Sequence, residues 1–132
     1  MLNGGCCCGF VRYESGAKPH DPTSCHCSIC RRASGAPFVA WFTVPTAEFR
    51  LLSGKLAKFR SSPKATRGFC PRCGTPLTFA FDALPDRVDV TTCSLDDPDA
   101  LPPRDHIYTS TMVGWLKLND GLPHFPESRG KD

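Results

Sequence analysis

The chain has 132 residues and a net charge of +3, with 40% hydrophobic and 22% charged residues. This composition fits one folded domain with a modest core and excludes a largely disordered chain. No apolar run approaches the roughly 18 residues that span a bilayer, and the scattered Lys and Arg residues form no basic stripe. We therefore expect neither a membrane nor a nucleic-acid partner.

Short segments rich in β-branched and aromatic residues lie between the prolines and glycines and predict strands. In chain order these are Phe10–Glu14, Pro37–Val44, Phe49–Ser53, Leu56–Arg60, Leu77–Phe81, Arg87–Leu95 and His106–Thr111. Ser28–Ser34 and Asp96–Ala100 can each form a short helical turn, and Ser53–Lys55 reads as a tight turn. The pattern predicts a mainly β protein of twisted antiparallel sheets with long loops. We expect a single domain over 1–132, with a core from about 4 to 125 and a loose tail over 126–132.

Nine cysteines are the unusual part of the composition. The first residues, from Met1 to Cys6, lack the basic and apolar regions of a secretion signal. We therefore expect a cytoplasmic protein whose thiols stay reduced, and clustered reduced thiols predict metal ligands.

Two of the three cysteine clusters end in glycine and can share one ion. Cys70 and Cys73 form a C-x-x-C knuckle that can hold a tetrahedral zinc at about 2.3 Å per sulfur. The glycine that follows permits a tight turn, in which backbone N–H groups face the sulfurs. In an extended chain Cys6 and Cys8 point to the same side while Cys7 points away. The four would make a closed site, whose role is folding.

The remaining cluster, Cys25-His26-Cys27-Ser28-Ile29-Cys30, packs three thiols into six residues. Three protein ligands leave one tetrahedral position open, which is typical of a catalytic zinc. Arg31 and Arg32 follow directly. Their guanidinium groups can offset the thiolate charge and attract an anionic substrate.

Spacing alone leaves other arrangements open. Cys27 and Cys30 could join Cys70 and Cys73 in one zinc ribbon, although the gap is far longer than the roughly 15–20 residues usual for a ribbon. His26 could be a fourth ligand, but we favour a solvent-facing position or one beside the ligands.

The other cysteines and histidines are given structural roles. We expect Cys7 and Cys93 to be small buried hydrophobic residues. The isolated histidines, His20, His106 and His124, are also expected to be structural.

In their order along the chain, these motifs resemble the glutathione-dependent formaldehyde-activating enzyme (GFA) family, whose domain is shared by centromere protein V. The matching motifs are Gly5-Cys6-Cys7-Cys8-Gly9, Cys25-His26-Cys27-x-x-Cys30-Arg31-Arg32, Ser61-Ser62-Pro63, Phe69-Cys70-Pro71-x-Cys73-Gly74-Thr75-Pro76-Leu77, Pro103-x-x-His106-Ile107, Trp115 and Gly121-Leu122-Pro123. The similarity runs from about Gly4 to Phe125. Two departures are Cys7, at a variable position, and Cys93, where a small residue is usual.

The resemblance implies a β-tent fold, also found in methionine-R-sulfoxide reductases, and two zinc ions. The structural zinc is implied on Cys6, Cys8, Cys70 and Cys73, and the catalytic zinc on Cys25, Cys27 and Cys30. The implied activity is that of a carbon–sulfur lyase, which condenses glutathione or a related thiol with formaldehyde or a small aldehyde.

Five residues are candidates for substrate binding under this activity. Guanidinium groups pair well with carboxylates, so Arg31 and Arg32 could bind those of glutathione. Ser61 and Ser62 could donate hydrogen bonds to the ligand, and Trp115 could wall the pocket.

Two other functions remain as alternatives. One is a non-catalytic zinc-binding interaction module of the centromere protein V kind, which should carry a basic or Pro-rich extension. The other is a sulfoxide reductase with Cys93 as its nucleophile.

Overall fold

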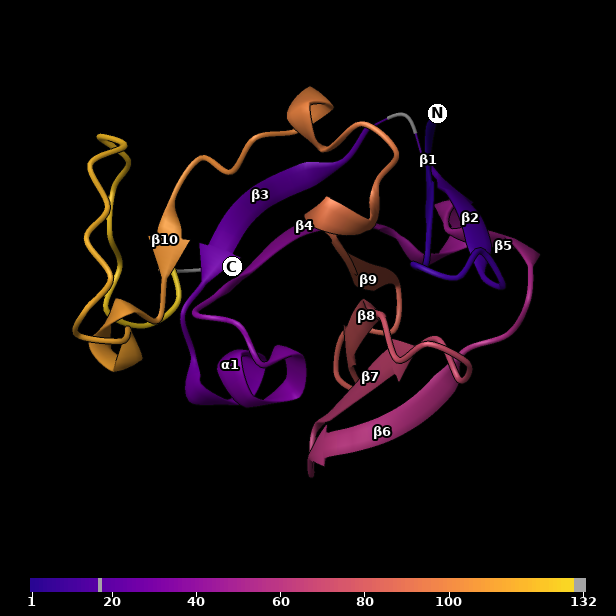
Figure 1. Cartoon of the computed structure of the whole chain (residues 1–132), viewed down its shortest axis with the longest axis horizontal. Coiled ribbons are helices and arrows are strands. Elements are labelled where there is room, and N and C mark those ends of the chain that lie inside the picture. The colour runs from indigo at the N-terminus through magenta and orange to yellow at the C-terminus, as the bar shows by residue number, and fades with distance from the viewer. Residues whose placement is uncertain (17, 130–132) are drawn as a thin grey trace.

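Two β-sheets make up the frame of the computed structural model, which describes residues 1–16 and 18–129 (Figure 1). The smaller sheet has the strand order β1-β2-β5. Its strands are β1 (Leu2–Gly5), β2 (Arg12–Ser15) and β5 (Arg50–Ser53). The larger sheet has seven strands in the order β10-β3-β4-β9-β8-β7-β6. These are β3 (His20–Cys25), β4 (Val39–Pro45), β6 (Ala57–Ser62), β7 (Ala65–Phe69), β8 (Pro76–Phe81), β9 (Arg87–Thr91) and β10 (His106–Ile107). All pairings are antiparallel except that of β10 with β3.

The helix α1 (Ser28–Ser34) begins three residues after the end of β3 and lies in the lower left part of the view in Figure 1. Its N-cap is Cys27, whose Sγ accepts a hydrogen bond from the backbone N–H of Cys30, and it ends at Gly35 with φ 65°. A left-handed glycine is a common end for a helix, because this conformation is strained for other residues. The described residues also form four 3-10 turns: η1 (Thr46–Glu48), η2 (Thr92–Ser94), η3 (Pro98–Ala100) and η4 (Thr109–Thr111). Among the described residues, none of the helices has the length and hydrophobicity needed to cross a bilayer.

Strand β4 shows how the larger sheet uses its two faces. Successive side chains of a strand point to opposite faces. Phe42 and Val44 are fully buried and belong to the main core, whereas Trp41 and Thr43 line a cavity on the other face. The main core gathers residues of both sheets: Cys6, Val11, Tyr13, Phe42, Val44, Cys70, Leu77, Val88, Val90 and Leu95. Full burial of each larger apolar side chain stabilises the fold by about 1.5–3 kcal/mol.

The expectation of a mainly β, antiparallel fold is confirmed. Each of the seven expected strands overlaps an observed one, and α1 coincides with the expected turn at Ser28–Ser34. Three strands were not predicted: β1, β3 and β7. The expected strand Arg87–Leu95 ends at Thr91, because the chain turns into η2, and the last expected strand is reduced to His106–Ile107.

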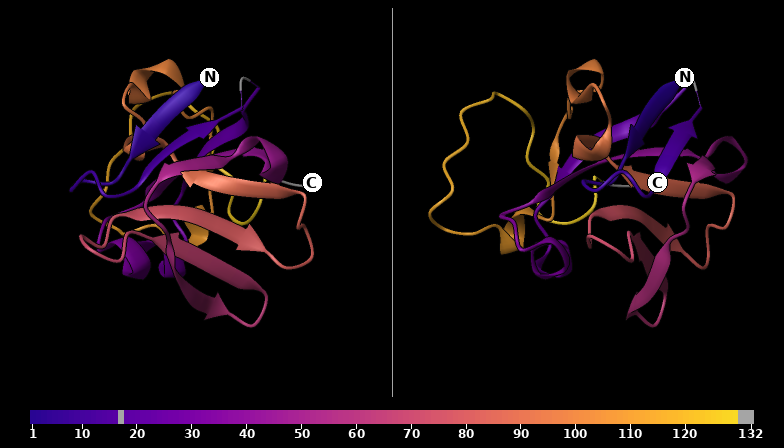
Figure 2. Two further views of the ribbon diagram at one scale, coloured as in Figure 1. Left: turned by 90° about the vertical axis from the view of Figure 1, so that its right-hand side faces the viewer. Right: turned by 45° about the vertical axis from the view of Figure 1, so that its right-hand side comes forward.

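A loose tail was expected over 126–132, but the described part of this range, up to Arg129, is hydrogen-bonded to the rest of the chain. This segment runs back along β10, where the Phe125 N–H donates to the His106 carbonyl at 2.8 Å and Arg129 donates to the Asp105 carboxylate. The loop between β10 and this return lies on the side of the molecule away from the N-terminus (Figure 2). Residues 130–132 lie outside the described part.

Candidate metal centres and the adjoining cavity

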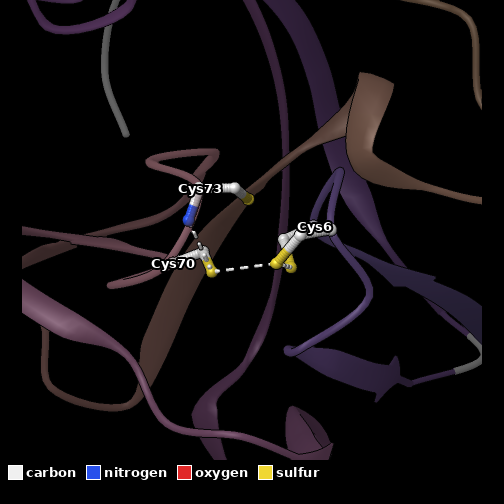
Figure 3. A group of neighbouring side chains, drawn as sticks. Cys6, Cys70 and Cys73 are labelled. Carbon is white, nitrogen blue, oxygen red and sulfur yellow. Dashed lines mark hydrogen bonds between the residues drawn. The ribbon is translucent and has the colours of Figure 1, made fainter.

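Four cysteines from distant parts of the chain converge beside the main core. Cys6 and Cys8 lie in the turn after β1, and Cys70 and Cys73 in the turn between β7 and β8. Figure 3 shows Cys6, Cys70 and Cys73 side by side. The Sγ atoms of Cys6 and Cys8 are 3.6 Å apart, and those of Cys8 and Cys70 are 3.9 Å apart. Four sulfurs at about 2.3 Å from one zinc ion would stand about 3.8 Å from each other, whereas a disulfide needs about 2.0 Å. The spacing therefore fits a tetrahedral metal site.

Backbone N–H groups face the buried sulfurs of this four-cysteine cluster, as the glycine at position 74 predicted. The Cys70 Sγ accepts from the N–H groups of Arg72 and Cys73, at 3.3 and 3.4 Å, and Gly74 has φ 80°. The Cys6 Sγ accepts from the Val11 N–H at 3.2 Å. Such bonds favour thiolates and orient them toward a metal ion.

The other three cysteines meet where β3 passes into α1. Cys25 ends the strand, Cys27 caps the helix and Cys30 lies in its first turn. The Sγ atoms of Cys25 and Cys30 are 3.4 Å apart, and all three sulfurs lie within 4.8 Å of one another. Hydrogen bonds within the cluster lower the pKa of Cys27 and raise that of Cys25. The positions of the three sulfurs allow this three-cysteine cluster to supply three ligands to one ion.

The structure sorts the seven cysteines as the four-and-three prediction required. Cys70 and Cys73 lie with Cys6 and Cys8, so a ribbon that joins them to the other cluster is not formed. Both groups could hold a metal ion.

A cavity of about 350 Å³ opens beside the three-cysteine cluster. This volume is in the range of small-molecule sites. All strands of the larger sheet contribute to its wall, and the contributions alternate along them, as Trp41 and Thr43 do on β4 and Phe79 and Phe81 on β8. The cavity therefore occupies the face of the sheet that turns away from the main core.

Arg67 on β7 is the functional candidate that the sequence analysis missed. Its side chain is 8% exposed, and its Nη2 donates to the Cys30 Sγ at 3.5 Å. The guanidinium lies over the rings of Phe79 and Trp41, with its carbon 5.0 and 5.8 Å from the ring centres. No signal in the sequence marks this arginine, because it lies 37 positions from the cysteine that it contacts.

Two polar atoms in the cavity wall are buried without a hydrogen-bond partner among the described residues, Arg67 Nε and Ser61 Oγ. Buried polar groups are usually paired, so such atoms need an explanation. Both atoms belong to residues that line the cavity.

The five predicted substrate residues are separated in space. Ser61 and Ser62 line the cavity. Arg31 and Arg32 lie in the last turn of α1, and the Trp115 side chain is 71% exposed. These three are not among the described residues that line the cavity.

His26 and the two remaining cysteines require corrections. His26 does not face solvent: it is fully buried, and its Nε2 is 2.9 Å from Nδ1 of His106. Burial and the nearby His106 and His124 lower the pKa of His26 to about 4. Cys7 and Cys93 are exposed and not buried, because each lies on a turn at the surface.

Comparisons with known proteins agree on the family. The model of a family described as "Glutathione-dependent formaldehyde-activating enzyme" matches residues 1–111. An uncharacterized lyase of Schizosaccharomyces pombe is 32% identical over 78 residues, which are 59% of this chain and 56% of that protein. A putative glutathione-dependent formaldehyde-activating enzyme of Halomonas elongata is 27% identical over 129 residues, 89% of this chain and 81% of its own.

A solved structure supports the fold alone. The crystal structure of a Rhodobacter sphaeroides protein aligns with a TM-score of 0.56 and 23% identity. The alignment covers 92% of this chain and 98% of that one.

Proposed function

The chain belongs to the glutathione-dependent formaldehyde-activating enzyme family, and we propose that it is a zinc-dependent carbon–sulfur lyase of this type. It would join glutathione, or a related thiol, to formaldehyde or another small aldehyde. In this reaction the sulfur bonds to the carbonyl carbon, the carbonyl π electrons move to oxygen, and the thiol proton ends on that oxygen. No oxidant or reductant is required.

The observation that carries the proposal is a set of three neighbouring cysteine side chains in the wall of a cavity. Cys25, Cys27 and Cys30 line the cavity together with Arg67 and Ser61. A zinc ion held by four cysteines has no coordination position free for a substrate. A zinc ion held by three cysteines keeps its fourth position open to a substrate. The four-cysteine cluster accordingly takes the structural zinc in this proposal, and the three-cysteine cluster takes the catalytic zinc.

Zinc bound to three thiolates would favour the deprotonated form of a thiol ligand and polarise a carbonyl oxygen. Arg67 is placed to act on the charge that develops during the reaction. Its Nη2 donates to Cys30 and the residue lines the cavity, so its positive charge can stabilise a substrate oxygen that becomes negative. A donor fixed in a dry site before the reaction is worth far more than one in water.

The walls of the cavity provide the dry surroundings and a second polar contact. Trp41, Phe79 and Phe81 are aromatic, and they limit the access of water to the reacting atoms. Ser61 Oγ can bond a polar group of the substrate, with Ser62 beside it. We assign substrate contact to these groups in preference to Arg31, Arg32 and Trp115. The chemistry requires reduced thiols and therefore fits the cytoplasm.

The test is an exchange measurement on the purified, zinc-loaded protein. Magnetisation exchange in NMR reports how fast glutathione and formaldehyde interconvert with S-(hydroxymethyl)glutathione. Wild type should accelerate exchange over the spontaneous rate, and Cys27→Ser should lower the acceleration about 100-fold or more, since even loss of an indirect partner of a metal ligand commonly costs 10- to 100-fold. Cys7→Ser is the matched control, because Cys7 is exposed and belongs to neither cluster.

Two outcomes would count against the proposal. Exchange at the spontaneous rate, with both sites loaded, would favour the non-catalytic module instead. Equal loss of exchange in Cys7→Ser would show that the effect does not depend on the three-cysteine cluster. The alternative function, a sulfoxide reductase with Cys93 as nucleophile, predicts that Cys93→Ser loses sulfoxide reduction. Under the lyase proposal, Cys93→Ser should leave the exchange rate unchanged.

A further inference from the structure

A third group of metal-ligating side chains lies outside both cysteine clusters. His106, Asp120 and His124 each offer one ligand atom, and these atoms lie within 4.8 Å of one another. His106 is 2% exposed, whereas the other two reach the surface. The proposed lyase reaction uses none of the three.

Backbone pairing holds this group in place. His106 on β10 forms a parallel bridge with His124, and its N–H donates to the Pro123 carbonyl at 2.9 Å. The Asp120 carboxylate is fixed through its Oδ1, which accepts from the Leu122 N–H at 3.1 Å. The ligand atoms are therefore set by main-chain contacts, which is what a metal site requires.

The buried His26 orients His106. The Nδ1 of His106 is 2.9 Å from His26 Nε2, while its Nε2 is 2.7 Å from Asp120 Oδ2. An imidazole that binds a metal through one nitrogen almost always donates its other N–H to a fixed partner, which sets the tautomer and the ring orientation. His26 supplies this partner, and Asp120 Oδ2 marks the side on which the ion would lie.

From this geometry we propose that His106, Asp120 and His124 form a third metal site, which takes a divalent transition metal such as Zn²⁺. Two imidazoles and a carboxylate are a ligand set of borderline softness that suits zinc. Because Asp120 and His124 are exposed, water can complete the coordination. The ion would take the place of the contact between His106 Nε2 and Asp120 Oδ2.

The position of the site suggests what the ion would do. His26, between Cys25 and Cys27, is tied to the same C-terminal segment by two more bonds. Its N–H donates to the Ile107 carbonyl at 3.0 Å, and its carbonyl accepts from the Thr111 hydroxyl at 3.0 Å. A metal ion at His106 would thus clamp residues 120–124 onto the segment that braces the three-cysteine cluster.

The experiment counts zinc on the full chain after both cysteine clusters are filled. Protein dialysed against a zinc buffer is analysed by mass spectrometry and calorimetry, for wild type, His124→Gln and Asp120→Asn. We expect three zinc ions per wild-type chain and about tenfold or more weaker binding of the third in each variant, with the first two unchanged. The matched control is His20→Gln, since His20 and Asp21 form an exposed pair at 3.0 Å that belongs to no three-ligand group among the described residues.

A measurement on unmodified protein guards against misfolded variants. The ring-proton resonances of His106 and His124 should shift on addition of the third equivalent, and that of His20 should not. Three results would each overturn the proposal. The wild-type chain could bind only two zinc ions, or the third ion could bind equally well to wild type and to either variant. The third equivalent could also leave the His106 and His124 resonances unshifted. None of these readouts depends on lyase activity.

Discussion

The two cysteine clusters use the same ligand type at the same spacing and differ in what surrounds them. Sulfur–sulfur distances are 3.6 and 3.9 Å in the four-cysteine cluster and 3.4 Å in the three-cysteine cluster. The first joins two turns next to the main core, and backbone N–H groups fill the space around its buried sulfurs. The second faces a cavity and the guanidinium of Arg67. If the proposed roles are right, the number of ligands and the surroundings distinguish the structural site from the catalytic one, because the ligand type is the same in both.

The largest effect should follow from Cys73→Ser. The Cys73 side chain is exposed, so its replacement removes almost no apolar burial. Any large loss of stability in this variant must therefore come from the loss of the metal ion, because metal binding contributes to the free energy of folding. We expect a loss of about 5 kcal/mol or more, enough to unfold a domain of ordinary stability. Thermal unfolding followed by circular dichroism, with zinc content measured in parallel, gives the result.

Cys27→Ser tests the other half of the comparison. Serine is a good N-cap, and its hydroxyl can accept the Cys30 N–H bond that the Cys27 sulfur accepts now. Helix α1 should therefore persist, and the melting temperature should change little. The zinc content of the two cysteine clusters should fall from two ions per chain to one. A variant as unstable as Cys73→Ser would falsify the division into a structural and a chemical cluster.

Arg67→Met should lower exchange activity by about 10- to 100-fold while zinc content stays constant, because a donor is lost and the metal ligands remain. Arg67→Lys should recover part of the activity, since it keeps the charge but not the planar fork. Arg60 on the neighbouring strand pairs with Asp82 at the surface, 2.8 Å away, and Arg60→Met is the matched control. If both Met variants lost activity alike, Arg67 would have no special role.

The smallest effect concerns the cavity wall. Burial raises the pKa of Asp89, although the hydroxyl of Thr43 donates to it. A carboxyl group with a raised pKa in the folded state destabilises that state once it ionises, so the penalty is absent below its unfolded pKa and complete above its folded pKa. Asp89→Asn should therefore stabilise the protein by about 0.5–1 kcal/mol at neutral pH. The gain in melting temperature should be smallest below about pH 4, the ordinary pKa of an aspartate, and should grow as the pH rises above it. A constant gain would show that ionisation is not the cause.

The sequence predicted the cysteine groups better than it predicted the strands. Spacing and glycine placement depend on local geometry, and Gly74 adopts the positive φ that this geometry requires. Strand β3 was missed because its sequence, His20–Cys25, contains a proline and a residue with φ 53°. The register shifts at this point, and such a strand forms because its neighbours pair with it.

Side chains that meet across the larger sheet could not be predicted. Arg67 reads as an ordinary charged residue of a strand, and its contact with Cys30 depends on how distant elements fold together. The contact of His26 with His106 spans 80 positions and follows from the pairing of β10 with β3. Local patterns carry no information on such contacts.

The alternation along β4 has a consequence for how this protein can change. Phe42 and Val44 pack in the core between the two sheets, while Trp41 and Thr43 of the same short strand line the cavity on the opposite face. Mutations at every second position can therefore alter which molecules are accepted without touching the residues that keep the chain folded. Libraries restricted to the cavity-facing positions of β4, β8 and β9 should yield new selectivity with few unfolded members, and homologues could diverge in substrate by the same route.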